Sequence, residues 1–322
     1  MKSRQRDAGI DAFRFIGAAA VVLLHSLAEA VPNTLPKTLA AIACRFAVPF
    51  FFLVSGYYVN TTNRTRLQLA IGPFVKLGPI FLGTAAIYYA ASFIIPLGHW
   101  EYGLNDMRHG PIFHLWFLPV LAISLACAGL GDAIVGLPIT IAVAVGVAGV
   151  GLSITSYGDL FGSTHAGARS GWFFGTALVA LGMGARRWNI RVSRSLATTM
   201  VAASYLLLIT EEVLVQHIAR APSLRSHDFI LLTFAFGGAV LLLARSIEPG
   251  PLTRLLAPAG RLSLGIYTFH VLFLRMWQPA LSGVQLATLK IALTTLGTTL
   301  VFTWLVARIP VARWLVTTGR AD

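Results

Sequence analysis

The stretch "FRFIGAAAVVLLH", residues 13–25, is an apolar run bounded by an arginine and a histidine. The apolar region around it extends over residues 10–29, which matches the about 20 residues that a membrane-spanning helix needs. Lys2, Arg4 and Arg6 precede it and "LAEA" (27–30) follows, as in a secretory signal. Asp11, Arg14 and His25 interrupt the apolar core that such a signal requires, so we expect a retained first helix.

The whole chain shares this apolar character. Of its 322 residues, 56% are hydrophobic and 11% are charged, and the mean hydropathy is +0.75. Soluble domains carry about 25% charged residues, so the composition predicts a polytopic membrane protein. The net charge of +13 comes from basic residues in short loops between apolar runs, which favours membrane orientation over nucleic-acid binding.

Ten segments are long and apolar enough to be candidate membrane helices: 10–29, 41–59, 74–96, 112–128, 134–154, 171–186, 196–215, 229–245, 262–280 and 286–308. With both termini cytoplasmic, this topology puts 17 basic residues on the inner side and 8 on the outer side, as the positive-inside rule requires. We therefore expect an all-α protein with a single transmembrane domain over 1–322 and no appended soluble domain. Cys44 and Cys127 lie in apolar stretches without zinc or disulfide spacing, so no metal site is expected.

Arg14 and His25 lie on one face of the first predicted helix. Eleven residues at 100° each end about 20° past three full turns, and they separate the two positions by about 16.5 Å. Asp11 lies three residues before Arg14 and can pair with it. Two interpretations stay open: an interfacial ion pair with a helix-end histidine, or a polar track that ends at a titratable imidazole.

The second predicted helix carries "RFAVPFFFLVSGYYV", residues 45–59. Pro49 should disturb the helix, because proline lacks an N–H and clashes with the preceding turn. Gly56 permits close backbone approach, while Ser55 and Tyr57 offer hydroxyl groups. The segment predicts either a kinked helix with a packing glycine or a locally irregular helix that lines a polar cavity.

Other polar residues extend these candidates. His270 falls midway along the ninth segment, and His114 lies at the outer end of the fourth; intramembrane ionisable groups are costly and often functional. Glu211 and Glu212 end the seventh segment, where an acidic residue could orient an imidazole or receive a substrate hydroxyl, or could simply form a solvated helix end. A basic inner loop holds Arg64, Arg66 and Lys76, which suits phosphate binding as well as membrane orientation.

Four of these motifs, in this order, resemble those of the acyltransferase family 3 membrane proteins. Arg14 and His25 match the family's pattern of a basic residue, ten positions and a histidine. "FFFLVSGYYV" is similar to its Phe-rich Ser-Gly-aromatic segment, and "HLWFL" and "SLGIYTFH" resemble two later signatures. Ile10-Asp11-Ala12-Phe13-Arg14 and "AVPFFFLVSGYY" look closer to the membrane domains of vancomycin-resistance serine racemases, which are assigned to amino-acid supply or transport.

The resemblance implies an enzyme of the bacterial inner membrane that moves an acyl group, usually acetyl, from cytoplasmic acyl-CoA to an extracytoplasmic glycan or lipid-linked acceptor. His25 would then be catalytic, as a base or as an acyl relay, with Glu212 as a second catalytic candidate. Arg14, with Arg64, Arg66 and Lys76, would bind the donor. Asp11, Arg45, Ser55, Gly56, Tyr57, His114 and His270 would line a polar cavity. A separate periplasmic partner and, as the alternative function, a transporter or binding domain for a small polar molecule stay open.

Overall fold

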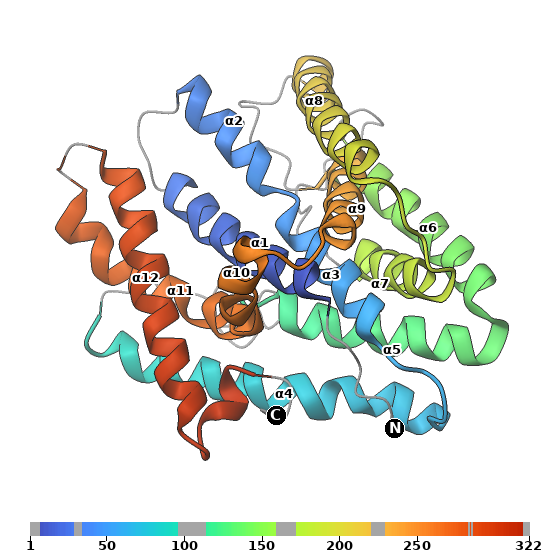
Figure 1. Cartoon of the computed structure of the whole chain (residues 1–322), viewed down its shortest axis with the longest axis horizontal. Coiled ribbons are helices and arrows are strands. Elements are labelled where there is room, and N and C mark those ends of the chain that lie inside the picture. Colours follow the sequence, from blue (N-terminus) through green and yellow to red (C-terminus); the bar gives the residue numbers. More distant parts are fainter. Residues whose placement is uncertain are drawn as a thin grey trace.

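The computed structural model describes residues 7–28, 34–95, 114–158, 172–219, 229–282, 284 and 286–317. These residues form helices and no strand (Figure 1). In chain order the helices are α1 (Ala8–Ala28), α2 (Leu35–Cys44), α3 (Ala47–Tyr58), α4 (Arg66–Ser92), α5 (Phe117–Val135), α6 (Leu137–Ile154), α7 (Trp172–Arg187), α8 (Arg194–Ala219), α9 (Leu231–Ser246), α10 (Pro251–Arg261), α11 (Ser263–Leu281) and α12 (Ala287–Arg308), followed by a 3-10 turn η3 (Arg313–Leu315).

The predicted all-α membrane class is confirmed. Seven helical segments in the described ranges are long and apolar enough to cross a membrane, with α2 and α3 counted together, and α9 is a shorter apolar helix. Each of the ten predicted segments contains a helix, although several start or end a few residues away from the predicted limits. The number of crossings and the cytoplasmic position of the termini stay predictions, as does the single-domain organisation.

The second predicted span is two helices rather than one. The chain leaves α2 at Arg45 and Phe46 and starts α3 at Ala47, so Pro49 is the third residue of the new helix. Proline is tolerated in the first turn of a helix, but its ring clashes with the carbonyl four residues earlier. That carbonyl belongs to Arg45, which is where the helical path is interrupted. The disturbance predicted from Pro49 is therefore confirmed, and its effect falls ahead of the proline.

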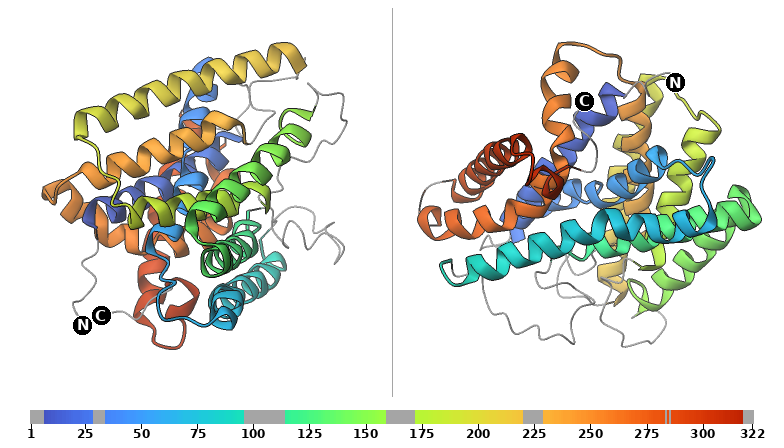
Figure 2. Two further views of the ribbon diagram at one scale, coloured as in Figure 1. Left: turned by 90° about the vertical axis from the view of Figure 1, so that its right-hand side faces the viewer. Right: turned by 90° about the horizontal axis from the view of Figure 1, so that it is seen from below.

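Helices α1 and α3 lie at the centre of the bundle, while α8 and α4 run along two of its outer edges (Figures 1 and 2). Helix α3 packs on α7, and the two backbones approach closely. A Cβ atom built on Gly56 would lie 2.0 Å from the Val179 carbonyl oxygen, and one on Gly182 would lie 2.0 Å from that of Leu53. The close approach predicted for Gly56 is confirmed, since only glycine fits at such a crossing.

Helix α10 was not expected from the sequence. Its 11 residues are too few, and too rich in proline and arginine, to resemble a membrane span. It packs against α1, where a Cβ on Gly260 would lie 1.6 Å from the Asp11 carbonyl oxygen. This contact places a short amphipathic helix beside the half of α1 that carries Arg14.

Candidate functional site

A cavity of about 1490 Å³ opens among the ends of several helices. Its wall is built from the start of α1, the end of α3, the first half of α4, the end of α7, the start of α8, the end of α9 and the start of α11, together with Phe117, Leu121 and Leu125 of α5. The ten-span topology assigns the helix ends in this wall to the cytoplasmic side, with the exception of the start of α5. Seven basic residues line the cavity, against three acidic ones: Arg14, Arg64, Lys76, Arg186, Arg191, Arg194 and Arg245, with Asp7, Asp11 and Glu248.

Most of the polar residues predicted near the inner face line this cavity. They include three of the four donor-binding candidates, and the lining residues among all candidates are Arg14, Arg64, Lys76, Asp11, Ser55 and Tyr57. Arg66 does not line it, because it is already the first residue of α4 and is exposed. The start of α4 is fixed by a capping box, in which Thr65 and Gln68 exchange side-chain and backbone hydrogen bonds. This cap leaves Arg64 in the loop that faces the cavity.

Two contacts orient the wall of the cavity. The predicted pairing of Arg14 with Asp11 is confirmed, with Nη1 donating to Oδ1 at 3.1 Å, and the Arg14 side chain keeps 22% of its surface exposed. Two guanidinium groups make cation–π contacts with the Tyr57 ring: that of Arg245 lies 4.9 Å, and that of Arg186 5.7 Å, from the ring centroid. Arg186 also donates to the Tyr57 carbonyl oxygen at 3.0 Å. Tyr57 therefore holds basic side chains in place.

Sequence reasoning missed the roles of Arg186, Arg191, Arg194 and Arg245, because it counted them only as inner-side loop charges. Arg186 lies in the last turn of α7, Arg191 follows that helix, Arg194 starts α8 and Arg245 lies near the end of α9. The packing of α7 and α9 on α3, and of α8 on α9, brings them to the same cavity as Arg14. The signal that could have found them was the clustering of basic residues at successive inner helix ends. The basic residues that indicated the membrane orientation therefore also line the cavity.

Asp7 closes the first turn of α1 at the cavity wall. Its Oδ1 accepts the backbone N–H groups of Gly9 at 3.0 Å and Ile10 at 3.2 Å. Burial raises the pKa of the Asp7 carboxyl above its ordinary value, although those two N–H groups and the charges of Arg245 and Arg191 act in the opposite direction. The Asp7 carboxyl is thus one of three acidic groups in a cavity that seven basic residues line.

The part of the cavity wall that lies deepest in the helix bundle contains two aromatic residues, which are close to His114 and His270. Tyr267 and Phe117 line the cavity, and their rings are 5.3 Å apart. The Tyr267 hydroxyl donates to the carbonyl oxygen of His114, and its ring lies 6.2 Å from that of His270. Tyr267 is thus both a wall of the cavity and a neighbour of the histidines.

The structure brings three predicted histidines together from three separate parts of the chain. The ring of His270 on α11 lies 5.1 Å from that of His25 on α1 and 5.0 Å from that of His114, which precedes α5. His270 is fully buried and His114 is 2% exposed, whereas His25 is only partly buried. Among the residues that the structure describes, no such group has the arrangement of a metal site. His25 is therefore the accessible member of the cluster.

Buried hydroxyl groups hold the cluster in place. Tyr88 on α4 is fully buried; its hydroxyl donates to the Thr268 carbonyl oxygen at 3.0 Å and accepts the Leu272 N–H at 3.1 Å. The same Thr268 oxygen lies 3.2 Å from Nε2 of His114. The tyrosine and His114 therefore fix one turn of α11, the turn that presents His270.

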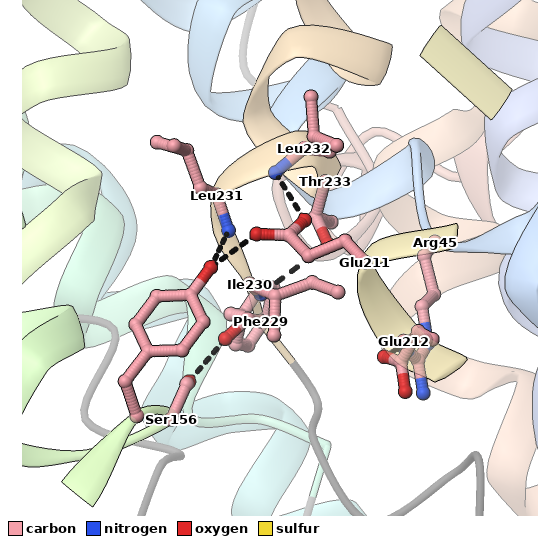
Figure 3. A network of polar contacts seen from close by, with 10 residues as sticks. Arg45, Ser156, Glu211, Glu212, Phe229, Ile230, Leu231, Leu232 and Thr233 are labelled. Carbon is pink, nitrogen blue, oxygen red and sulfur yellow. Dashed lines mark hydrogen bonds and ion pairs between the residues drawn. The ribbon is translucent and has the colours of Figure 1, made fainter. Parts of the chain in front are cut away.

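The second group of predicted residues lies elsewhere, in a network around α8 (Figure 3). Glu212 is fully buried and forms an ion pair with Arg45, at the break between α2 and α3. Glu211 accepts the Tyr157 hydroxyl and, at 2.8 Å, the Leu232 N–H at the start of α9. Neither Arg45 nor Glu212 lines the cavity. The predicted catalytic role of Glu212 stays a prediction, and its observed contact is with Arg45.

The chain is similar to parts of several known racemases from enterococci. The chain is 24% identical over 245 residues to an amino-acid racemase of Enterococcus faecalis, covering 66% of this chain and 34% of that protein. A second amino-acid racemase of that species is 29% identical over 141 residues (40% and 19%), and a serine/alanine racemase of Enterococcus gallinarum is 31% identical over 131 residues (36% and 18%). The chain thus spans about a third, or less, of the length of these relatives. No solved structure matches it.

The acyltransferase domain of family 3 matches residues 7–308, nearly the whole chain. The match includes the cavity wall and all three members of the histidine cluster. The chain therefore belongs to the acyltransferase 3 family of multi-pass membrane proteins.

Proposed function

We propose that the protein transfers an acetyl group from cytoplasmic acetyl-CoA to a hydroxyl group of an extracytoplasmic glycan or lipid-linked acceptor, in a bacterial inner membrane. The observation that carries the proposal is a strongly basic cavity with Tyr267 in its wall, the ring of which lies 6.2 Å from that of His270 in the histidine cluster. Membrane acyl transfer belongs to the family, and the donor, the acceptor and the residue roles are the proposed part.

The charge of the cavity supports an anionic donor. Seven basic side chains face a volume of about 1490 Å³ that only three acidic residues line. Arg245 is buried and Arg14 and Arg186 are half-buried, whereas Arg64, Lys76, Arg191 and Arg194 are exposed. Buried positive charge in excess of its acidic partners is unfavourable unless a ligand or counterions neutralise it. Guanidinium groups bind phosphate through paired, charge-assisted hydrogen bonds, so the phosphates of CoA suit this wall.

The position of His25 supports the chemistry. It lies eleven residues beyond Arg14 on α1, about 16.5 Å farther along the helix, and an extended donor arm is of suitable length for that separation. His25 takes the proton of the acceptor hydroxyl, the oxygen attacks the thioester carbonyl carbon, and the C–S bond breaks. The CoA thiolate then receives the proton from His25. An acyl relay on the His25 ring is the other route, and trapping with hydroxylamine tests it.

Transport or binding of a small polar molecule is the second candidate function. It is favoured by the relatives, which are named amino-acid and serine/alanine racemases. A polar cavity within a helix bundle suits a transported solute as well as a donor. Glu248, Asp7 and Asp11 would then interact with the amino group of the solute and the arginines with its carboxylate.

A sidedness assay separates the two functions. Inverted membrane vesicles containing the protein receive acetyl-CoA labelled in the acetyl group on their outer, cytoplasmic face. Acyl transfer predicts alkali-labile label in luminal glycan or lipid, and its loss in vesicles with His25→Ala. Proteoliposomes tested with labelled L-serine and no acyl donor provide the second arm. Serine uptake without any acetyl ester formation would replace the proposed function by the transport function.

A further inference from the structure

The tautomer of His270 is fixed by a backbone oxygen. Its Nδ1 lies 2.7 Å from the carbonyl oxygen of Tyr267, and a carbonyl oxygen can only accept a hydrogen bond. Nδ1 must therefore carry the proton. In the neutral ring Nε2 is then an acceptor with a lone pair, and its role is set by the bond at the opposite side of the ring.

That Nε2 atom is buried and, among the residues that the structure describes, no hydrogen-bond donor contacts it. Buried acceptors usually have a donor, because leaving one without a partner costs free energy. Two rings are close enough to supply it: those of His25, 5.1 Å away, and His114, 5.0 Å away. These two histidines are therefore the side chains to consider first as its donor.

His114 is unsuited to be this donor. Its Nε2 lies 3.2 Å from the Thr268 carbonyl oxygen, so the Nε2 proton of the neutral ring points to that oxygen. Its Nδ1 then carries a lone pair and cannot donate to His270. The neutral His25 ring carries one N–H, it contacts the His270 ring, and it is the partly exposed member of the cluster.

We propose that His270 is the positioning residue for His25, with His270 Nε2 accepting an N–H of the His25 ring. This inference rests on the proposed function. The contact fixes one nitrogen of His25 as the donor to His270 and leaves the other as the base that faces the acceptor hydroxyl. When His25 takes the hydroxyl proton it becomes an imidazolium, and His270 stabilises that charge through the same hydrogen bond. When His25 returns the proton to the CoA thiolate, both rings are neutral again.

A matched pair of variants tests the contact. His270→Asn keeps an N–H at the position of Nδ1, so the bond to the Tyr267 carbonyl oxygen survives and the acceptor at Nε2 is lost. His270→Gln does the reverse, because its side-chain oxygen reaches the position of Nε2. A purely structural role at Tyr267 predicts that Asn is the better replacement. The proposal predicts that Gln is.

For acetyl transfer in the vesicle assay, we expect His270→Asn to lower kcat about 10- to 100-fold, with KM for acetyl-CoA within about twofold. The loss should be smaller than the about 10⁴-fold seen when a charged orienting carboxylate is removed from a catalytic triad, because His270 is neutral. His270→Gln should retain at least about tenfold more activity than His270→Asn. Asn activity equal to or above Gln activity would overturn the proposal.

A second measurement needs no turnover. Diethyl pyrocarbonate modifies neutral imidazole nitrogens, and peptide mass spectrometry gives the rate at His25, with exposed His217 on α8 as the internal control. We expect His25 to react more slowly in His270→Asn than in the wild type and in His270→Gln, with His217 unchanged. If wild-type transfer is absent but this order of rates holds, the proposed function fails and the histidine contact stands. If wild-type transfer is present and the rates at His25 do not differ, the contact fails alone.

Discussion

Helix α8 has ionisable groups at both ends, and the two ends differ in how their charges are balanced. Arg194 at its start faces a cavity lined by seven basic and three acidic residues. Glu212, 18 residues and about 27 Å farther along the helix, pairs one-to-one with Arg45 inside packed helices. Both sets of residues interrupt apolar sequence, so hydropathy treats them alike.

The difference separates charges that need a ligand from charges that hold a fold together. At the Glu212 end, Arg45 forms an ion pair with Glu212, whose second oxygen has no hydrogen-bond partner among the described residues. The Glu211 carboxylate accepts hydrogen bonds from the Tyr157 hydroxyl and the Leu232 N–H (Figure 3). At the cavity end the excess positive charge lacks acidic partners of equal number, and the space beside it is open. An excess of charge of one sign around a cavity indicates a binding site, whereas an ion pair enclosed by packed helices indicates a structural role. Four predictions, from the largest effect to the smallest, test this comparison.

Replacing His25 should have the largest effect on activity. His25→Ala removes the proposed base, and we expect acetyl transfer to fall about 10²- to 10⁴-fold, the range for loss of a general acid–base group. The thermal unfolding temperature should change little, because His25 is only partly buried. The vesicle assay and a thermal melt in detergent measure the two quantities. Transfer at the wild-type rate by a folded His25→Ala protein contradicts the catalytic role.

Replacing Glu212 should have the largest effect on stability. Glu212→Ala leaves the Arg45 charge buried without its carboxylate, and removing one partner of a buried pair costs about 3–5 kcal/mol. The double variant Arg45→Met with Glu212→Met should recover most of that loss, and Glu248→Ala at the cavity rim is the control that should change little. Thermal melts measure all three. A stable Glu212→Gln protein without acetyl transfer would instead support the catalytic role predicted for Glu212.

Two adjacent arginines at the end of α7 give a matched test of donor binding. Arg186 lines the cavity, whereas Arg187 forms two hydrogen bonds of 2.7 Å with Asp132 outside it. Arg186→Ala should weaken acetyl-CoA binding about tenfold or more, since hydrogen bonds to charged groups contribute about 1.5–3 kcal/mol. Arg187→Ala should leave binding unchanged and cost about 1 kcal/mol of stability or less. The dissociation constant of acetyl-CoA, measured with each variant in nanodiscs, tests this prediction. Equal changes in the two variants would contradict the cavity as the donor site.

Asp7 should give the smallest effect. Asp7→Asn keeps a side-chain oxygen for the Gly9 and Ile10 N–H groups and removes one negative charge from the cavity, so acetyl-CoA should bind about two- to fivefold more tightly. Because burial raises the pKa of Asp7 in the fold, its contribution to stability is present at low pH and is lost as the pH rises through that raised pKa. Wild-type binding should likewise strengthen as the pH falls and Asp7 is protonated. An identical pH dependence in Asp7→Asn would show that another group controls it.

Much of the site was visible in the sequence as separate candidates. The geometry of α1 predicted the Asp11–Arg14 pair, and hydropathy singled out His114 and His270 as expensive residues in apolar segments. Their meeting with His25 was not predictable, because 155 residues separate His270 from His114 and each position alone also suits a helix end. The break at Arg45, by contrast, agrees with the disturbance predicted from Pro49, because proline acts on the carbonyl four residues before it.

The sequence by itself determined the membrane class, the helical segments and the family motifs, because each depends on local composition and on the fixed period of a helix. Only the tertiary structure decided which charges act together. Arg186, Arg191, Arg194 and Arg245 join Arg14 because α7, α8 and α9 bring their ends to the same cavity as α1. Glu212 meets Arg45 instead, at the far end of α8. Burial and pairing depend on helix packing, and helix packing is set by contacts between residues far apart in the chain.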